Sequence, residues 1–121
     1  MFNPLDFLTF VKNLPTTNHH EARVRTIIGR AYYATFLKMR EWLKNKGYNF
    51  PSGRDEAQNH RLVQDYLFQE FQQRGPKDRL HDLRQLRNDV DYNLDIEFTI
   101  TEANRAIRLA ESILRYTSIS P

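Results

Sequence analysis

The sequence predicts an all-α fold, an antiparallel bundle of four main helices preceded by a short N-terminal helix. Three observations support it: apolar residues recur at spacings of three and four through most of the chain, no segment alternates apolar and polar residues as a strand does, and most of the 4 glycines and 5 prolines fall between the periodic segments. Amphipathic helices joined by short turns bury their apolar faces against one another, which gives a helical bundle.

End signals define the first two predicted helices. The range Pro4–Leu14 forms the short helix, with Asn3 as its N-cap and proline at its first position. Asn18 and an acid three residues later form a capping-box pattern, which opens a long helix over His19–Lys46. Gly47 stops that helix, because glycine readily adopts the left-handed conformation that ends helices.

Three further helices follow the longest connection, Gly47–Ala57. The third covers Asn59–Arg74 and the fourth covers Pro76–Tyr92, with a Gly-Pro pair between them. Thr99 with an acid three residues later is another capping box and begins the last helix, whose apolar stripe reaches Leu114.

Composition limits the class of protein. A chain of 121 residues, 40% hydrophobic and 27% charged, is long and apolar enough for one globular domain, which we expect to cover 1–121. The absence of cysteine excludes disulfides and thiolate zinc sites. The N-terminus does not read as a signal peptide, and no apolar run is long enough to cross a bilayer. We therefore expect a cytoplasmic protein without membrane contact.

The basic residues are mostly arginine. The net charge of +3 is too small to indicate nucleic-acid binding, but 13 of the 18 basic residues are arginine. The planar guanidinium group suits bidentate recognition of phosphate or carboxylate better than lysine does. The alternative is that the arginines form ordinary salt bridges on the surface or in a dimer.

The segment from Leu83 to Tyr92 contains the most informative residues of the chain. Its apolar residues form a helical stripe, and the same spacing gathers polar residues on a neighbouring face. An acid, a carboxamide and two arginines beside an apolar seam predict a place where a phosphate or a partner chain is held. The four polar residues are Arg84, Arg87, Asn88 and Asp91.

Two segments resemble landmarks of the HEPN family (higher eukaryotes and prokaryotes nucleotide-binding). Residues 29–36, Gly-Arg-Ala-Tyr-Tyr-Ala-Thr-Phe, are similar to the Arg-Ala-Tyr-Tyr-Ala-x-Phe signature on the family's long second helix. Residues 86–92, Leu-Arg-Asn-Asp-Val-Asp-Tyr, resemble its second landmark, an arginine followed after four residues by an aromatic residue or histidine. His60 and the three residues after it are similar to a third, weaker landmark.

This resemblance implies a dimeric helical bundle from a prokaryotic toxin–antitoxin or defence system. Many such domains are metal-independent endoribonucleases, and many are paired with a small nucleotidyltransferase. The catalytic motif is an arginine, a polar residue and a histidine four to six residues on, and two copies form one RNA-cleaving cleft. Arg87 and Asn88 match that motif, but Tyr92 stands where the histidine would be, as in an Arg-x4-Tyr subfamily. No cofactor or metal is implied.

RNA cleavage without metal needs a base, an acid and a cation that stabilises the phosphorane. Arg87 fits the role of the cation. A tyrosine hydroxyl loses its proton well above neutral pH, so Tyr92 could donate a proton or a hydrogen bond, and Asp91 is the candidate base. The alternative is structural: Arg87 and Asp91 form an ion pair, and Tyr92 is a packing residue with a satisfied hydroxyl.

Further candidates lie outside this motif. Arg30, Tyr33 and Arg84 are predicted to bind nucleic acid or another ligand; alternatively, the tyrosines are core residues and Arg30 pairs with an acid such as Asp91 or Asp89. His60 reads as isolated, whereas His81, one turn before Arg84, could supply a histidine to the same cleft. The adjacent pair His19 and His20 diverges on a helix and cannot chelate one metal ion.

Besides a plain dimeric scaffold, two functions remain open from the sequence. The first is an RNA- or nucleotide-directed HEPN protein, either an endoribonuclease or a degenerate relative that still binds RNA. The second is a non-catalytic dimeric module that partners a nucleotidyltransferase. In both, we expect a homodimer formed through the long second helix and the helix of Arg87.

Overall fold

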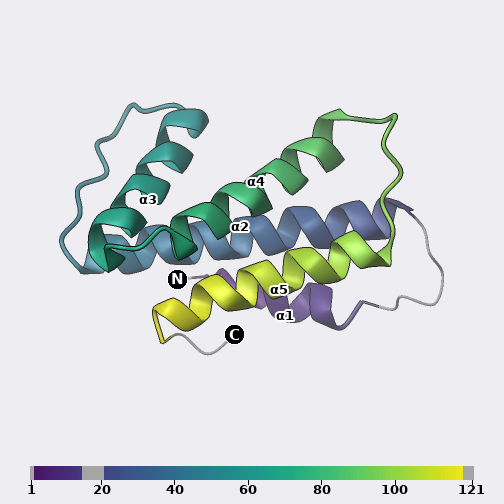
Figure 1. The fold of residues 1–121 in the computed structure, drawn as a ribbon, viewed down its shortest axis with the longest axis horizontal. Coiled ribbons are helices and arrows are strands. Elements are labelled where there is room, and N and C mark those ends of the chain that lie inside the picture. The colour runs from purple at the N-terminus through teal and green to yellow at the C-terminus, as the bar shows by residue number, and fades with distance from the viewer. Residues whose placement is uncertain (1, 15–20, 119–121) are drawn as a thin grey trace.

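The computed structural model describes residues 2–14 and 21–118, and within these two stretches the chain forms five helices and no strand. Figure 1 shows α4 running against the directions of both α2 and α5. The predicted all-α fold is therefore confirmed for the described part of the chain. The helices are α1 (Leu5–Lys12), α2 (Glu21–Asn45), α3 (Glu56–Phe71), α4 (Gly75–Tyr92) and α5 (Ile100–Tyr116).

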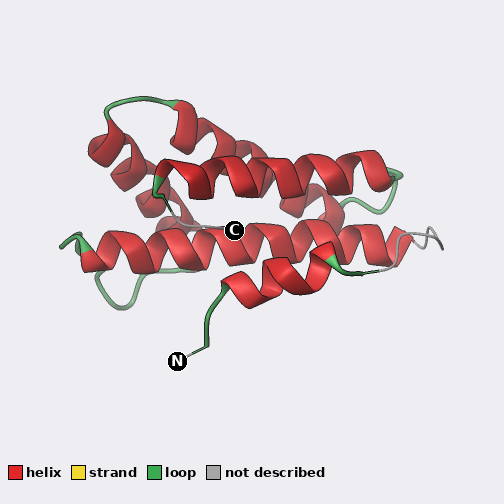
Figure 2. Ribbon diagram, turned by 90° about the horizontal axis from the view of Figure 1, so that it is seen from below, coloured by secondary structure: helices red, strands yellow, loops and turns green. Residues whose placement is uncertain are grey.

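Helix α2 is the central element of the bundle. It is the longest helix, with 25 residues, and it contacts each of the other four. Figure 2 shows α1 lying alongside it. Burying apolar surface on several sides of one helix requires apolar residues around much of its circumference, and α2 supplies them. Its buried residues are Val24, Ile27, Ile28, Ala31, Tyr32, Ala34, Thr35, Phe36, Met39 and Leu43.

Helix α3 begins earlier than the sequence pattern predicted. A capping box at Asp55 starts it: the Asp55 side chain accepts a hydrogen bond from Gln58 N (2.8 Å), and the Gln58 side chain accepts one from Asp55 N (3.0 Å). Glu56 is consequently the first helical residue, where the predicted boundaries had placed it in the 47–57 loop. This difference brings Glu56 into the first turn, from which it reaches α4.

The other helix ends agree with the prediction to within a few residues. Thr99 forms its predicted capping box at the start of α5, and Gly47 adopts a left-handed φ of 99° after α2. Helix α1 is shorter than predicted, and α3 ends at Phe71, beyond which Gln72 is left-handed (φ 54°). The predicted capping box at residue 18 lies outside the described residues.

Arg25 of α2 holds the end of α4 and the loop after it. Its Nη1 donates to the carbonyl of Val90 (2.6 Å), and its Nη2 donates to those of Ile96 (2.8 Å) and Asn93 (3.3 Å). Glu21 accepts from the same guanidinium at 2.9 Å. The last carbonyls of a helix lack partners within the helix, and this arginine satisfies one of them in α4, that of Val90. Sequence analysis did not single out Arg25.

No helix formed by the described residues combines the length and the apolar character that a membrane span requires.

We expect Arg25→Ala to lower the free energy of unfolding by about 2–3 kcal/mol, because three carbonyls would lose a charged donor. Urea denaturation of the variant and the parent protein would measure the difference. Arg74→Ala is the matched control: among the described residues, the side chain of Arg74 pairs with Asp78 alone, at an exposed site, and such a pair is worth at most ~1 kcal/mol. Equal losses in the two variants would contradict the role given to Arg25.

Candidate functional site

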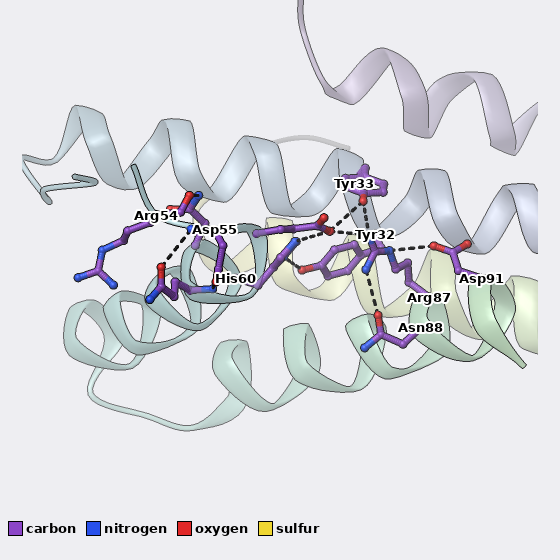
Figure 3. A network of polar contacts seen from close by, with 11 residues as sticks. Tyr32, Tyr33, Arg54, Asp55, His60, Arg87, Asn88 and Asp91 are labelled. Atoms are coloured by element: carbon purple, nitrogen blue, oxygen red, sulfur yellow. Dashed lines mark hydrogen bonds and ion pairs between the residues drawn. The ribbon is translucent and has the colours of Figure 1, made fainter. Parts of the chain in front are cut away.

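Arg87 lies at the centre of a network of polar contacts between α2, α3 and α4 (Figure 3). Its side chain extends from α4 into the bundle, and the residue is only 5% exposed. Nη2 donates to the hydroxyl of Tyr33 and to Glu56 Oε1 (2.6 Å), and Nη1 donates to Asn88 Oδ1 (3.0 Å). A buried cation needs compensating partners, and here residues from three helices provide them.

Asp91 supplies a second carboxylate to the same guanidinium. Its Oδ2 lies 3.1 Å from Arg87 Nε, which is an ion-pair distance. The angle does not allow a hydrogen bond, so this buried Nε–H has no hydrogen-bond partner in the described parts of the chain. The ion pair between Arg87 and Asp91, expected as the structural alternative, is therefore present.

Glu56 Oε1 is the point where the network converges. It lies 2.6 Å from Arg87 Nη2, 3.1 Å from the Tyr33 hydroxyl and 3.2 Å from His60 Nε2. The hydrogen bond from Arg87 is the main reason that the pKa of the Glu56 carboxyl is lowered, and it outweighs the opposing effect of burial. The carboxylate is therefore fully ionised at neutral pH. Its side chain is 58% exposed.

His60 is fully buried and links the network to the core. Burial, aided by the positive charge of Arg84, lowers the pKa of its imidazole to about 4. The ring is therefore neutral at pH 7. Burial also raises the pKa of the Tyr32 hydroxyl, which makes Tyr32 a donor. The assignment that fits both facts has Tyr32 donating to His60 Nδ1 and His60 Nε2–H donating to Glu56.

A pocket opens beside the network and shares two of its residues, Tyr33 and Asp91. Its volume is about 340 Å³. Arg30 contributes an exposed guanidinium, which lies 5.0 Å from the centre of the Phe7 ring. Arg30 forms no ion pair with an acid of the described residues, so the pairing expected as an alternative is wrong. The pocket is lined by Arg25, Thr26, Gly29, Arg30, Tyr33 and Asp91.

The structure separates the two tyrosines and places Arg84 near the network. Tyr32 is a fully buried core residue, as the structural alternative expected, whereas Tyr33 is half-buried and lines the pocket. Arg84 is half-buried, lies near enough to His60 to affect its pKa, and has a buried Nε without a hydrogen-bond partner among the residues that the structure describes.

Two predicted candidates do not join the network. Tyr92 ends α4 and is 77% exposed, and its hydroxyl bonds to no residue in the two described stretches, so the expectation that it packs with a satisfied hydroxyl is wrong. His81 is exposed and lies outside the network. The histidine that does join it is His60, which the sequence pattern suggested was isolated.

Sequence analysis missed Glu56 as part of this site. A signal was present: Glu56 and His60 are four residues apart, which places them on one face of a helix if the helix includes both. The predicted start at Asn59 hid this relation, because it left Glu56 in a loop. Recognising Asp55 and Gln58 as a capping box would have revealed it.

The network is suited to binding an anion rather than to transferring protons. Arg87 and Tyr33 present donors in fixed positions. The histidine beside them, His60, is buried and titrates far below neutral pH, which does not suit a general base or acid. Within residues 2–14 and 21–118, no three side chains of metal-binding types gather to hold an ion. His19 and His20 lie outside these ranges.

His60 should make the protein sensitive to mild acid. Its folded-state pKa of about 4 lies below the unfolded value of 6.5, so the unfolded chain takes up a proton that the folded chain refuses. The contribution of His60 to the free energy of unfolding is complete above pH 6.5. It falls by about 1.4 kcal/mol per pH unit, or about 3 kcal/mol in total, as the pH drops to 4. Urea denaturation at pH 7.5, 6.5, 5.5 and 4.5 would measure this slope.

In the same series, His60→Gln should reduce the slope of unfolding free energy against pH by the amount that one proton contributes. This reduction should appear whatever the free energy of unfolding of the variant at pH 7.5. His81→Gln is the matched control, because His81 is exposed, and it should leave the slope unchanged. A slope that survives the loss of His60 would mean that another group titrates in this range.

Comparison with known proteins places the chain in a family. Residues 16–119 match the HEPN domain. Two uncharacterized proteins of Methanocaldococcus jannaschii are similar to it: MJ0628 is 38% identical over 109 residues (78% of this chain, 66% of the relative), and MJ0992 is 33% identical over 122 residues (88% and 69%). The chain thus spans about two thirds of these relatives. No solved structure gives a significant match. The family match covers most of the chain and both landmark segments, so the chain belongs to the HEPN domain family.

Proposed function

We propose that this HEPN protein binds RNA through its backbone phosphates, at the surface formed by the Arg87 network and the adjoining pocket. The observation that supports this most directly is the placement of the Arg87 guanidinium. It is buried and oriented by neighbours on two sides, and it donates to the hydroxyl of Tyr33, which also lines an open pocket. A guanidinium fixed in this way loses little conformational freedom when it binds a phosphate, and its fork matches phosphate oxygens.

The charges around this surface also support an anionic ligand. Three arginines, Arg84, Arg87 and the exposed Arg30, lie in the network or around its pocket, whereas two carboxylates, Glu56 and Asp91, pair with Arg87. Arg25 lines the same pocket, but its donors are committed to carbonyl groups. Arg30 is therefore the pocket cation best placed to contact a phosphate from solvent.

The proposed activity is binding without cleavage. Cleavage without metal needs a group that exchanges protons near neutral pH beside the phosphate. His60 is buried and neutral, and Tyr92 lies in solvent at the end of α4. We therefore infer a degenerate relative of the HEPN endoribonucleases, and membership of the family supports a place in a toxin–antitoxin or defence system.

A second candidate function is that of a protein-interaction module, and exposed apolar residues favour it. Tyr92 (77% exposed), Leu94 (84%) and Ile96 (39%) lie within five residues at the end of the Arg87 motif and in the loop after it. Clustered exposed apolar residues typically mark contact with another protein. The proposed occupant is a second copy of this chain, or a nucleotidyltransferase. Arg87 itself is buried within its own chain, so this contact would use Leu94 rather than Arg87.

For RNA binding, Arg30→Ala should weaken affinity for a short single-stranded RNA about fivefold to tenfold, and it should reduce the dependence of log K on log salt by nearly one unit. Fluorescence anisotropy in EDTA from 50 to 200 mM salt would measure both. Arg74→Ala, which removes an exposed arginine at the start of α4, is the control for net charge. Wild-type protein without RNA affinity at 50 mM salt would refute the proposal, and cleavage of the RNA in EDTA would refute binding without catalysis.

For self-association, Leu94→Asp should weaken the dimer by about tenfold or more in sedimentation equilibrium, because a charge would replace exposed apolar surface at the contact. The fold should be unaffected, since Leu94 is largely exposed. Phe68→Asp on α3 removes another exposed apolar residue and should leave association unchanged. A wild-type protein that sediments as a monomer would leave the nucleotidyltransferase as the proposed partner.

A further inference from the structure

Glu56 occupies the position in the network where an anionic ligand would bind. All three of its contacts, with Arg87 Nη2, the Tyr33 hydroxyl and His60 Nε2, are made by a single oxygen, Oε1. The other side of the side chain is open to solvent, because 58% of it is exposed. An internal carboxylate therefore neutralises a set of donors that would otherwise be directed at one point.

We propose that this point is a phosphate subsite, that the Glu56 carboxylate fills it in the free protein, and that a backbone phosphate of RNA displaces the carboxylate when RNA binds. This inference rests on the proposed function and adds a regulatory step to it. A phosphate oxygen at the position of Oε1 would accept from the same three donors, and charge-assisted hydrogen bonds of this kind are among the stronger ones in proteins.

Glu56 can leave without unfolding its helix. The start of α3 is secured by Asp55 and Gln58, whose reciprocal hydrogen bonds do not involve Glu56. The released carboxylate would be hydrated, because its side chain already borders solvent. The donors would keep their positions: Asp91 and Asn88 still hold Arg87, and Tyr32 still holds His60.

Competition between the two anions sets the affinity. RNA has to displace a charged group whose pKa is lowered by Arg87, so part of its binding energy is used to break that ion pair. A neutral side chain of the same shape would compete less well. Glu56→Gln should therefore bind single-stranded RNA about tenfold or more tightly than wild type, a change that corresponds to ~1.4 kcal/mol.

Glu70 provides a matched control on the same helix. Its carboxylate accepts from the Tyr48 hydroxyl (2.9 Å) and pairs with Lys46 Nζ (3.3 Å), so it resembles Glu56 in having a tyrosine and a cation as partners. Glu70→Gln removes the same charge but leaves the Arg87 network intact. Its RNA affinity should remain within about twofold of wild type by fluorescence anisotropy. An equal gain in both variants would mean a general charge effect and would overturn the proposal.

The remaining outcomes separate this inference from the proposed function. If wild type binds RNA and Glu56→Gln does not bind it more tightly, the displacement is wrong and the RNA-binding function stands. If neither binds RNA at 50 mM salt, both are overturned. If Glu56→Gln binds inorganic phosphate but no RNA, the subsite serves a free anion and the RNA assignment is wrong. Thermal unfolding of each variant would confirm that it is folded, and Glu56→Ala would repeat the test without a carboxamide.

RNA should also change the environment of His60. Nitrogen-15 NMR of the histidine side chains should show the His60 Nε2 signal shifting as wild-type protein is titrated with RNA, because its acceptor changes from carboxylate to phosphate. The exposed His81 provides an internal reference. RNA binding that leaves the His60 signal unchanged would overturn the displacement.

Discussion

The burial of the Arg87 charge is the constraint around which the site is built. A guanidinium that is 5% exposed is costly unless carboxylates and hydrogen-bond acceptors surround it. The chain meets this need from three helices: α2 provides Tyr33, α3 provides Glu56, and α4 provides Asn88 and Asp91. Through Glu56 the network also reaches the buried His60, which in turn is bonded to Tyr32.

Much of this architecture could be predicted from the sequence, because it depends on local patterns. Apolar periodicity gave the helices, and Thr99 and Gly47 marked two of their ends correctly. The cluster of Arg87, Asn88 and Asp91 follows from helical spacing alone. Contacts between helices were harder to predict: the position of α3 beside α2 and α4 lets Glu56 meet Arg87 and His60 meet Tyr32, and no spacing within a single helix encodes that position.

The site combines the features of a binding surface with a missing proton-transfer group. Family membership and the fixed guanidinium of Arg87 agree with recognition of a phosphate. The exposed position of Tyr92 and the buried, neutral His60 do not supply acid–base chemistry next to it. Under the proposed function, such a site would orient and neutralise a phosphate without moving protons.

Arg25 connects the two surfaces that we propose for binding. One is the Arg87 network, and the other is the apolar loop, defined by the exposed Tyr92, Leu94 and Ile96. The Arg25 guanidinium bonds to the carbonyl of Ile96, within the apolar loop, and to that of Val90, next to Asp91. A protein docked on this loop, as proposed, would contact the segment bonded to the same side chain that fixes the last turn of α4, where one of the two carboxylates facing Arg87 is attached. If both proposed surfaces are occupied, a shift of Arg25 by one partner would alter affinity for the other, and the effect would be equal in both directions.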